Sequence, residues 1–269
     1  MDDPESLRLL ETSLRTTMAA ASGGKLDAAL TELGWGDMLD EMPGIAIPLV
    51  FRLLGETGAH APVLNDVVSR ETGAAPGGTP PLPFAGGAWV IWARGECVGS
   101  AIDDALPIQR VAQGDWLPSS ALAAGRQALG WWLVGTGRAM LSLARRHALD
   151  RVQFGRHVSS FQAIRHRLAE TLVAIEGAEA TLRVAAQVGD HDGLASLLAK
   201  AAAGQAALTA ARHCQQVLAG IGFTAEHPLH HHVKRSLILE GLLGNTRELT
   251  REAGKVLADN GFAPRLAQL

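Results

Sequence analysis

A run of histidines near the C-terminal end of the chain suggests metal chemistry by residue type alone. His227 is followed by His230, His231 and His232, and imidazole nitrogens are common zinc ligands. However, adjacent histidines point in different directions around a helix, and neither a cysteine nor a carboxylate completes a ligand set here. We therefore expect no metal site.

Two other segments of the C-terminal half carry polar and aromatic residues in a defined order. Residues 151–166 contain an Arg-x-Gln-Phe-Gly turn and then Phe-Gln at the start of a long Ala/Leu-rich helix. Residues 216–229 read Gln-Val-Leu-Ala-Gly-Ile-Gly-Phe-Thr-Ala-Glu-His-Pro-Leu. The first segment resembles the flavin-contacting signature of the acyl-CoA dehydrogenases. The second is similar to the Gln-x-x-Gly-Gly-x-Gly element of the same family and to the Glu-x-Pro step that follows it.

The resemblance implies that the cofactor is FAD and that two subunits share each flavin. In this family the helical bundle of one subunit reaches the adenosine diphosphate half of a flavin held mainly by its neighbour. The resemblance assigns the pyrophosphate to Arg151, because a planar guanidinium suits phosphate oxygens, and the adenine end to Gln216 and Gly220. The residues expected to line the same channel are Gln153, Phe154, Val158, Phe161 and Gln162.

Some of these residues also have an ordinary structural interpretation. Arg151 could satisfy carbonyl groups at a helix connection, and residues such as Phe154 and Phe161 fill the core in most helical proteins. Gly222 permits close approach of the backbone to the adenine. Ala219 replaces the first glycine of the family pair and is a departure from the family pattern.

The carboxylate that the family reaction requires is missing from both of its usual positions. Dehydrogenation between the α and β carbons of an acyl-CoA needs a base to remove the α-proton while the flavin accepts the β-hydride. The family pattern places this base at Leu243, followed by Gly244 and Asn245, or alternatively at Gly125 beside Arg126. Neither leucine nor glycine can remove a proton. The sequence therefore predicts a family member without its own catalytic base.

Glu240 is the candidate for replacing the missing catalytic base. It lies three residues before Leu243, close to one helical turn, so its carboxylate could reach the same cavity if the helix were rotated. The alternative is an exposed or ion-paired helix residue near Lys234 and Arg235.

Composition excludes several other classes of protein. The chain has 269 residues, 47% of them hydrophobic, and a net charge of −3 without runs of like charge, so it can bury a core but is not built for nucleic acid or anionic lipid. The two cysteines, Cys97 and Cys214, are too few for a disulfide framework. The acidic N-terminus is unlike a secretory signal, and Arg138 interrupts the longest apolar stretch. We expect a cytoplasmic protein without a membrane span.

The order of the predicted elements agrees with the resemblance. We expect a mainly α fold with an N-terminal helical domain over 1–72, a linker and truncated β middle domain over 73–117, and a C-terminal four-helix bundle over 118–269. Apolar periodicity predicts the bundle helices. Short β-branched and aromatic runs predict the strands. The expected helices are 120–149, 158–188, 193–219 and 228–258, the strands are 88–93, 97–102 and 108–111, and the Pro/Gly-rich linker is 73–83.

These observations predict a non-catalytic subunit that completes the FAD site of a heteromeric acyl-CoA dehydrogenase, with two copies of each subunit. Its partners are then the catalytic subunit and an acyl-CoA bound mainly by that subunit. Residues 222–227 and 242–244 are most similar to actinobacterial family members, some of which act on steroid-derived CoA thioesters. One alternative is a self-sufficient homo-oligomeric enzyme that uses Glu240. Another is a flavin-free structural subunit.

Overall fold

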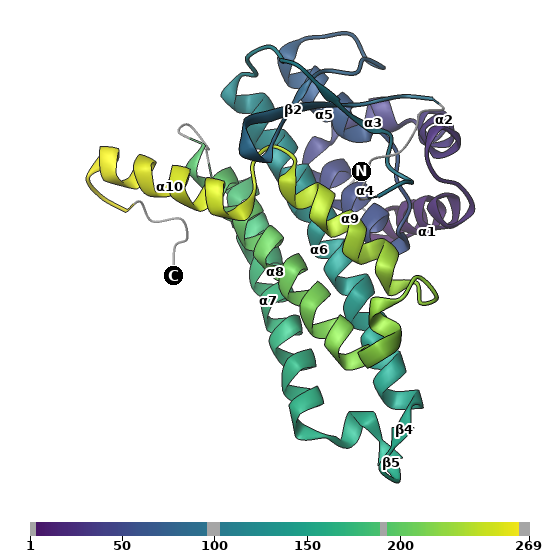
Figure 1. Ribbon diagram of the computed structural model, residues 1–269. Helices are drawn as coiled ribbons and strands as arrows, with labels where there is room; N and C mark the ends of the chain where they lie inside the picture. Colours follow the sequence, from purple (N-terminus) through teal and green to yellow (C-terminus); the bar gives the residue numbers. More distant parts are fainter. Residues whose placement is uncertain (1–3, 96–102, 189–192, 264–269) are drawn as a thin grey trace.

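The N-terminal part of the molecule is a cluster of five helices (Figure 1). The computed structural model describes residues 4–95, 103–188 and 193–263. Glycines in the left-handed region end three of these helices and permit the sharp turns between them, for example Gly58 and Gly73. The helices are α1 (Pro4–Ala20), α2 (Gly24–Glu32), α3 (Trp35–Glu41), α4 (Pro43–Thr57) and α5 (Val63–Thr72).

The middle segment forms a small antiparallel sheet in the order β1-β2-β3. The strands are β1 (Leu82–Phe84), β2 (Ala88–Trp92) and β3 (Ile108–Val111), with a 3-10 turn at Ala85–Gly87. Leu82 pairs with Val90 and Pro83 with Trp89, so the end of the segment predicted to be a linker is a strand. Cross-strand pairing here overrides the proline, because an edge strand tolerates one. The strand predicted at 97–102 lies outside the described residues.

The C-terminal half contains the bundle. Its helices are α6 (Ser119–Asp150), α7 (Gln162–Gln187), α8 (Leu194–Leu218), α9 (Leu229–Gly241) and α10 (Thr246–Asn260), with 3-10 turns at Val158–Ser160 and Ala219–Phe223. Helices α6 to α9 form the bundle, and β4 (Val152–Gln153) pairs with β5 (Arg156–His157) at its far end (Figure 1).

The prediction of one helix over 228–258 is wrong. The backbone turns between α9 and α10, where Leu243 and Gly244 have φ angles of 55° and 98°. Asn245 then begins α10 with a capping box formed with Glu248. As a result α10 leaves the bundle and packs its apolar face on α8 (Figure 1).

The N-terminal helices meet the bundle through a backbone contact between α4 and α6. A Cβ atom at Gly55 would overlap the backbone of Trp132 and Thr136, and one at Gly135 would overlap the Arg52 carbonyl. Aromatic rings pack around the contact. The ring centroid of Trp132 lies 5.6 Å from that of Phe51 and 5.4 Å from that of Trp92, which is stacked on it.

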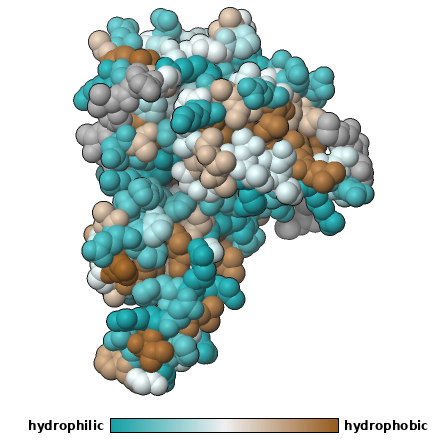
Figure 2. All heavy atoms as spheres, turned by 90° about the vertical axis from the view of Figure 1, so that its right-hand side faces the viewer, coloured by the Kyte–Doolittle hydropathy of each residue, from teal (hydrophilic) through white to brown (hydrophobic). Residues whose placement is uncertain are grey.

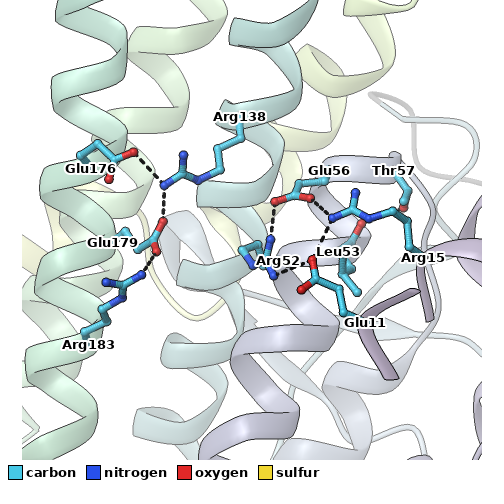
Figure 3. Close-up of polar contacts among 10 residues, drawn as sticks. All are labelled: Glu11, Arg15, Arg52, Leu53, Glu56, Thr57, Arg138, Glu176, Glu179 and Arg183. Atoms are coloured by element: carbon cyan, nitrogen blue, oxygen red, sulfur yellow. Dashed lines mark hydrogen bonds and ion pairs between the residues drawn. The ribbon is translucent and has the colours of Figure 1, made fainter. Parts of the chain in front are cut away.

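Two groups of ion pairs lie beside this contact (Figure 3). One joins α1 to α4 and the other joins α6 to α7. The first group is Glu11, Arg15, Arg52 and Glu56, and the second is Arg138, Glu176, Glu179 and Arg183. The arginine that interrupts the apolar stretch of α6, Arg138, is therefore balanced by carboxylates of α7.

Helix α8 is the core helix of the bundle. Within the described residues, the segment Leu194–Phe223 is the one helix whose length and hydropathy would suit a membrane span, and 72% of its apolar window is already buried inside the protein. Burial of this extent is typical of a core helix.

A buried ion pair joins α9 to the other two parts of the chain. Arg235 donates to Asp103 at 2.7 Å and to the carbonyls of Gly58 and Ala59. Burial, followed by the positive charge of Arg235, lowers the pKa of His60 from 6.5 to about 4, although Asp103 opposes the shift. Burial, followed by Arg235 and His231, lowers the pKa of His232 to about 4 as well.

We expect the protein to lose stability as the pH falls from 6.5 to 4. In this range His60 and His232 become protonated in the unfolded chain but stay neutral in the folded protein. The free energy of unfolding therefore falls by roughly 2 kcal/mol for each histidine. The change His232→Gln should remove roughly half of the loss, as measured by urea unfolding at several pH values. The exposed His166→Gln serves as control, and equal pH slopes in all three proteins would contradict the assignment.

Candidate functional site

A pocket of about 680 Å³ opens at the end of the bundle where α6, α7 and α8 meet the β4–β5 hairpin. We call it the bundle-end pocket. It is lined by His147, Arg151, Gln153, Phe154, Val158, Phe161, Ala163, Ile164, Gln216, Val217, Leu218, Ala219, Gly220 and Ile221. Most of these side chains are apolar, so the pocket suits a flat ring better than a charged group.

The β4–β5 hairpin forms one lip of the pocket. Gln153 pairs with Arg156, and the two turn residues, Phe154 and Gly155, have φ angles of 55° and 76°, as tight hairpin turns require. The Phe154 side chain is 92% exposed and its ring meets the edge of Phe161 at 6.1 Å. Figure 2 shows hydrophobic atoms at the lower tip of the molecule, where Figure 1 places this hairpin.

Arg151 stands between α6 and the hairpin. Its N–H donates to the His147 carbonyl at 2.9 Å and its carbonyl accepts from the Val158 N–H at 2.8 Å. The guanidinium is exposed and, among the described residues, has no carboxylate or carbonyl partner. The alternative that Arg151 satisfies carbonyl groups of the helix connection thus finds no support in the geometry.

The opposite lip is the turn that follows α8. Ala219 has φ 53° and ψ −135°, a conformation that normally requires glycine and stores strain. Gly220 is exposed, and the space around its Cβ position is open. Gly222 is different, because a Cβ there would lie 2.6 Å from the Gln215 carbonyl oxygen. Its small size is already required by the turn itself.

Seven of the eight residues predicted for cofactor binding line this one pocket. The exception is Gln162, which is the first residue of α7. Its Nε2 lies 3.4 Å from Nε2 of His166. Sequence reasoning missed His147, which lies in the last turn of α6 and whose carbonyl accepts the N–H of Arg151, the residue that follows the helix. Burial, followed by the Arg151 charge, lowers the pKa of His147, while Asp150 opposes the shift.

The two positions where the family keeps its base lie against each other in the protein interior. A Cβ atom at Gly125 would be 2.5 Å from Leu243 Cδ1 and 3.4 Å from Val68. Leu243 is fully buried, and its N–H donates to the Pro83 carbonyl at 2.8 Å. The adjacent Gly241 lies under the Phe84 ring. We call this region the sealed interior, because leucine, valine and phenylalanine side chains fill it.

Glu240 faces α8 and the start of α10, since its side chain lies beside Gly204 and Thr246. Its carboxylate accepts the Thr246 N–H at 2.6 Å at the start of α10, and it lines a groove with Gln205 and Arg247. Beneath it the buried Lys200 amine donates to the carbonyls of Glu240 and Gly244, at 2.9 and 2.5 Å. Burial lowers the pKa of Lys200 to about 7. Both side chains thus hold the turn between α9 and α10.

Known proteins are similar to this chain in sequence and in fold. The family model "Acyl-CoA dehydrogenase, C-terminal domain" matches residues 113–256, more than half of the chain. The acyl-CoA dehydrogenase FadE34 of Mycobacterium tuberculosis is 32% identical over 226 residues, which are 75% of this chain and 30% of that protein. The chain spans about a third of the length of the curated relatives it matches.

Two solved structures share the fold over nearly their whole length. The Tcur3481–Tcur3483 steroid ACAD superposes with a TM-score of 0.69 at 18% identity, covering 96% of this chain and 99% of that chain. The ChsE4–ChsE5 complex from Mycobacterium tuberculosis gives a TM-score of 0.67 at 18% identity, covering 98% and 100%. Since the family match covers more than half of the sequence and the fold agrees over the rest, this chain belongs to the acyl-CoA dehydrogenase family.

Proposed function

We propose that this chain is the non-catalytic subunit that completes the FAD site of a heteromeric acyl-CoA dehydrogenase. The assembly contains two copies of each subunit and dehydrogenates an acyl-CoA thioester between its α and β carbons. The catalytic partner supplies the base, the isoalloxazine site and most of the contacts to the acyl-CoA.

The observation that carries this proposal is the contrast between the sealed interior and the bundle-end pocket. Gly125 and Leu243 pack against each other where a base would need space for a substrate carbon, and an apolar side chain cannot accept a proton. The bundle-end pocket remains open, and the exposed guanidinium of Arg151 stands at its rim. The chain has thus lost the groups for proton removal and kept those suited to binding a nucleotide.

The residues of the bundle-end pocket fit the adenosine diphosphate half of FAD. Phe161, Val158 and Ile221 offer apolar surface for an adenine ring. Arg151 offers an exposed guanidinium for a diphosphate, without an ion pair among the described residues. The chemistry that a bound flavin supplies in this family is the acceptance of a hydride from the acyl-CoA. The described part of the middle segment offers a three-stranded sheet, so we assign the isoalloxazine to the partner.

The structural neighbours support a two-chain assembly and a steroid substrate. One of them is a steroid ACAD and another is a complex of two named chains, and each aligned chain matches almost the full length of this one. We therefore infer that steroid-derived CoA thioesters are the first substrates to test.

The self-sufficient enzyme that would use Glu240 fits the geometry less well. The Glu240 carboxylate accepts a backbone N–H of α10, while Leu243 faces Gly125. A flavin-free structural subunit would have no use for an exposed arginine at an open pocket. The three possibilities are separated by the experiments below.

We expect a yellow complex when the chain is co-expressed with its catalytic acyl-CoA dehydrogenase partner, and little flavin in either chain alone. The change Arg151→Ala should remove most of the flavin absorbance from the complex, because the diphosphate loses its cation, whereas Arg145→Ala, an exposed arginine outside the pocket, should not. Stoichiometric flavin in the lone chain would contradict the proposal that the flavin site is shared between two subunits. Unchanged flavin in the Arg151→Ala complex would favour a structural role.

The change Glu240→Gln tests the self-sufficient enzyme. Glutamine keeps an oxygen that accepts the Thr246 N–H, so the fold should be retained. We expect turnover of the complex to stay within about twofold of the wild type. Loss of turnover with flavin retained would identify Glu240 as the base and overturn the proposal.

A double-mutant cycle tests whether the interior is sealed. Gly125→Ala should lower the free energy of unfolding by about 1 to 3 kcal/mol through overpacking, and Leu243→Ala by about 2 to 5 kcal/mol through a cavity. Combined, they should cost less than the sum, because the new methyl group enters the space that Leu243 leaves. The matched pair Gly125→Ala and Leu249→Ala should be additive, since Leu249 belongs to a separate cluster. Additivity in both pairs would mean that Gly125 and Leu243 do not touch.

A further inference from the structure

A second pocket adjoins the bundle-end pocket and shares two residues with it. It has a volume of about 570 Å³ and contains His147 and Arg151 in its wall, as the bundle-end pocket does. We call it the basic pocket. Its other residues are Leu143, Arg146, Asp150, His227 and Pro228.

The two pockets differ in character. The bundle-end pocket is lined mainly by apolar side chains, whereas the basic pocket combines two arginines and two histidines with one carboxylate. An apolar pocket and a basic pocket on either side of one arginine match a ligand that has a flat ring at one end and phosphates at the other. Arg151 stands where these two ends would join.

His227 is held in a defined state at the edge of the basic pocket. Its Nδ1 accepts the Leu229 N–H at 3.1 Å, so the neutral ring carries its proton on Nε2 and can donate there. His230 Nδ1 donates to the His227 carbonyl at 2.8 Å and fixes the backbone of the same residue. The ring is therefore prepared to donate a hydrogen bond to an anion.

The basic groups of this pocket repel one another in the free protein. Burial, followed by His147, Arg146 and His230, lowers the pKa of His227. Burial and then Arg151 lower the pKa of His147, against which Asp150 acts. A bound anion would offset this repulsion and favour protonation of His147, whereas the neutral His227 ring would donate its Nε2–H to the anion.

We propose that Arg146 and His227, together with His147 and Arg151, form an anion site for the diphosphate of an adenine nucleotide whose adenosine occupies the bundle-end pocket. The inference rests on the proposed function, because it extends the flavin nucleotide from the bundle-end pocket into the basic pocket. Arg146 and His227 thereby become binding residues that the Arg-x-Gln-Phe-Gly motif does not contain.

The test is calorimetric binding of ADP, adenosine and inorganic pyrophosphate to the flavin-depleted complex of the chain with its catalytic partner. Arg146→Gln and His227→Gln should each weaken ADP and pyrophosphate about tenfold and leave adenosine binding unchanged. Arg145→Gln is the matched control, because it removes the same charge from the neighbouring position but lines neither pocket. The affinity of the wild type for ADP should rise from about pH 8 to about pH 6, and His147→Gln should reduce that rise.

The outcomes separate the inference from the function on which it rests. If Arg151→Gln weakens ADP while Arg146→Gln and His227→Gln bind it as the wild type does, the nucleotide pocket stands and the second anion site is refuted. The absence of ADP binding by the wild type, or equal binding by all variants, refutes both. Pyrophosphate binding that is lost in Arg146→Gln, with no contribution from adenosine, would mean a free phosphate site and would overturn the link to the nucleotide.

Discussion

The close approach of α4 and α6 at Gly55 and Gly135 is the constraint on which the rest of this structure depends. Each glycine faces the backbone of the other helix at a distance that no Cβ atom could occupy. The approach sets Trp132 against Phe51 and Trp92, so one aromatic group serves the N-terminal helices, the small sheet and the bundle together. Because α6 is fixed in this way, the positions of all residues along it are fixed as well.

Helix α6 connects the sealed interior to the proposed nucleotide site at the other end of the bundle. From Gly125 to Arg151 is 26 residues, which corresponds to roughly 39 Å along a helix. The end that begins near Gly125 is covered by α5, β1 and the turn after α9. The far end is open and carries the hairpin and two adjoining pockets. The absence of a base at one end of the helix therefore leaves the geometry of the proposed nucleotide pocket at the other end unaffected.

The sequence was sufficient for features that depend on neighbouring residues. The Arg-x-Gln-Phe-Gly turn and the Gln216 segment could be identified because each is a short local pattern, and the bundle brings them to one pocket. Features that depend on distant partners could not be predicted. The turn at Leu243 requires the Pro83 carbonyl and the buried Lys200 amine, and β1 requires β2. Likewise, Gly222 looked like a ligand-contacting glycine, although its own helix already requires its small size.

The exposed phenylalanine at the tip of the hairpin bears on how such a chain exists in a cell. Phe154 holds a nearly fully exposed ring on a strained turn, beside a largely apolar pocket that is also open to water. Exposed apolar surface of this kind promotes unspecific association until it is covered. For the proposed two-subunit assembly, synthesis of both subunits in matched amounts, close in time and space, would therefore matter as much for the survival of this chain as its own folding.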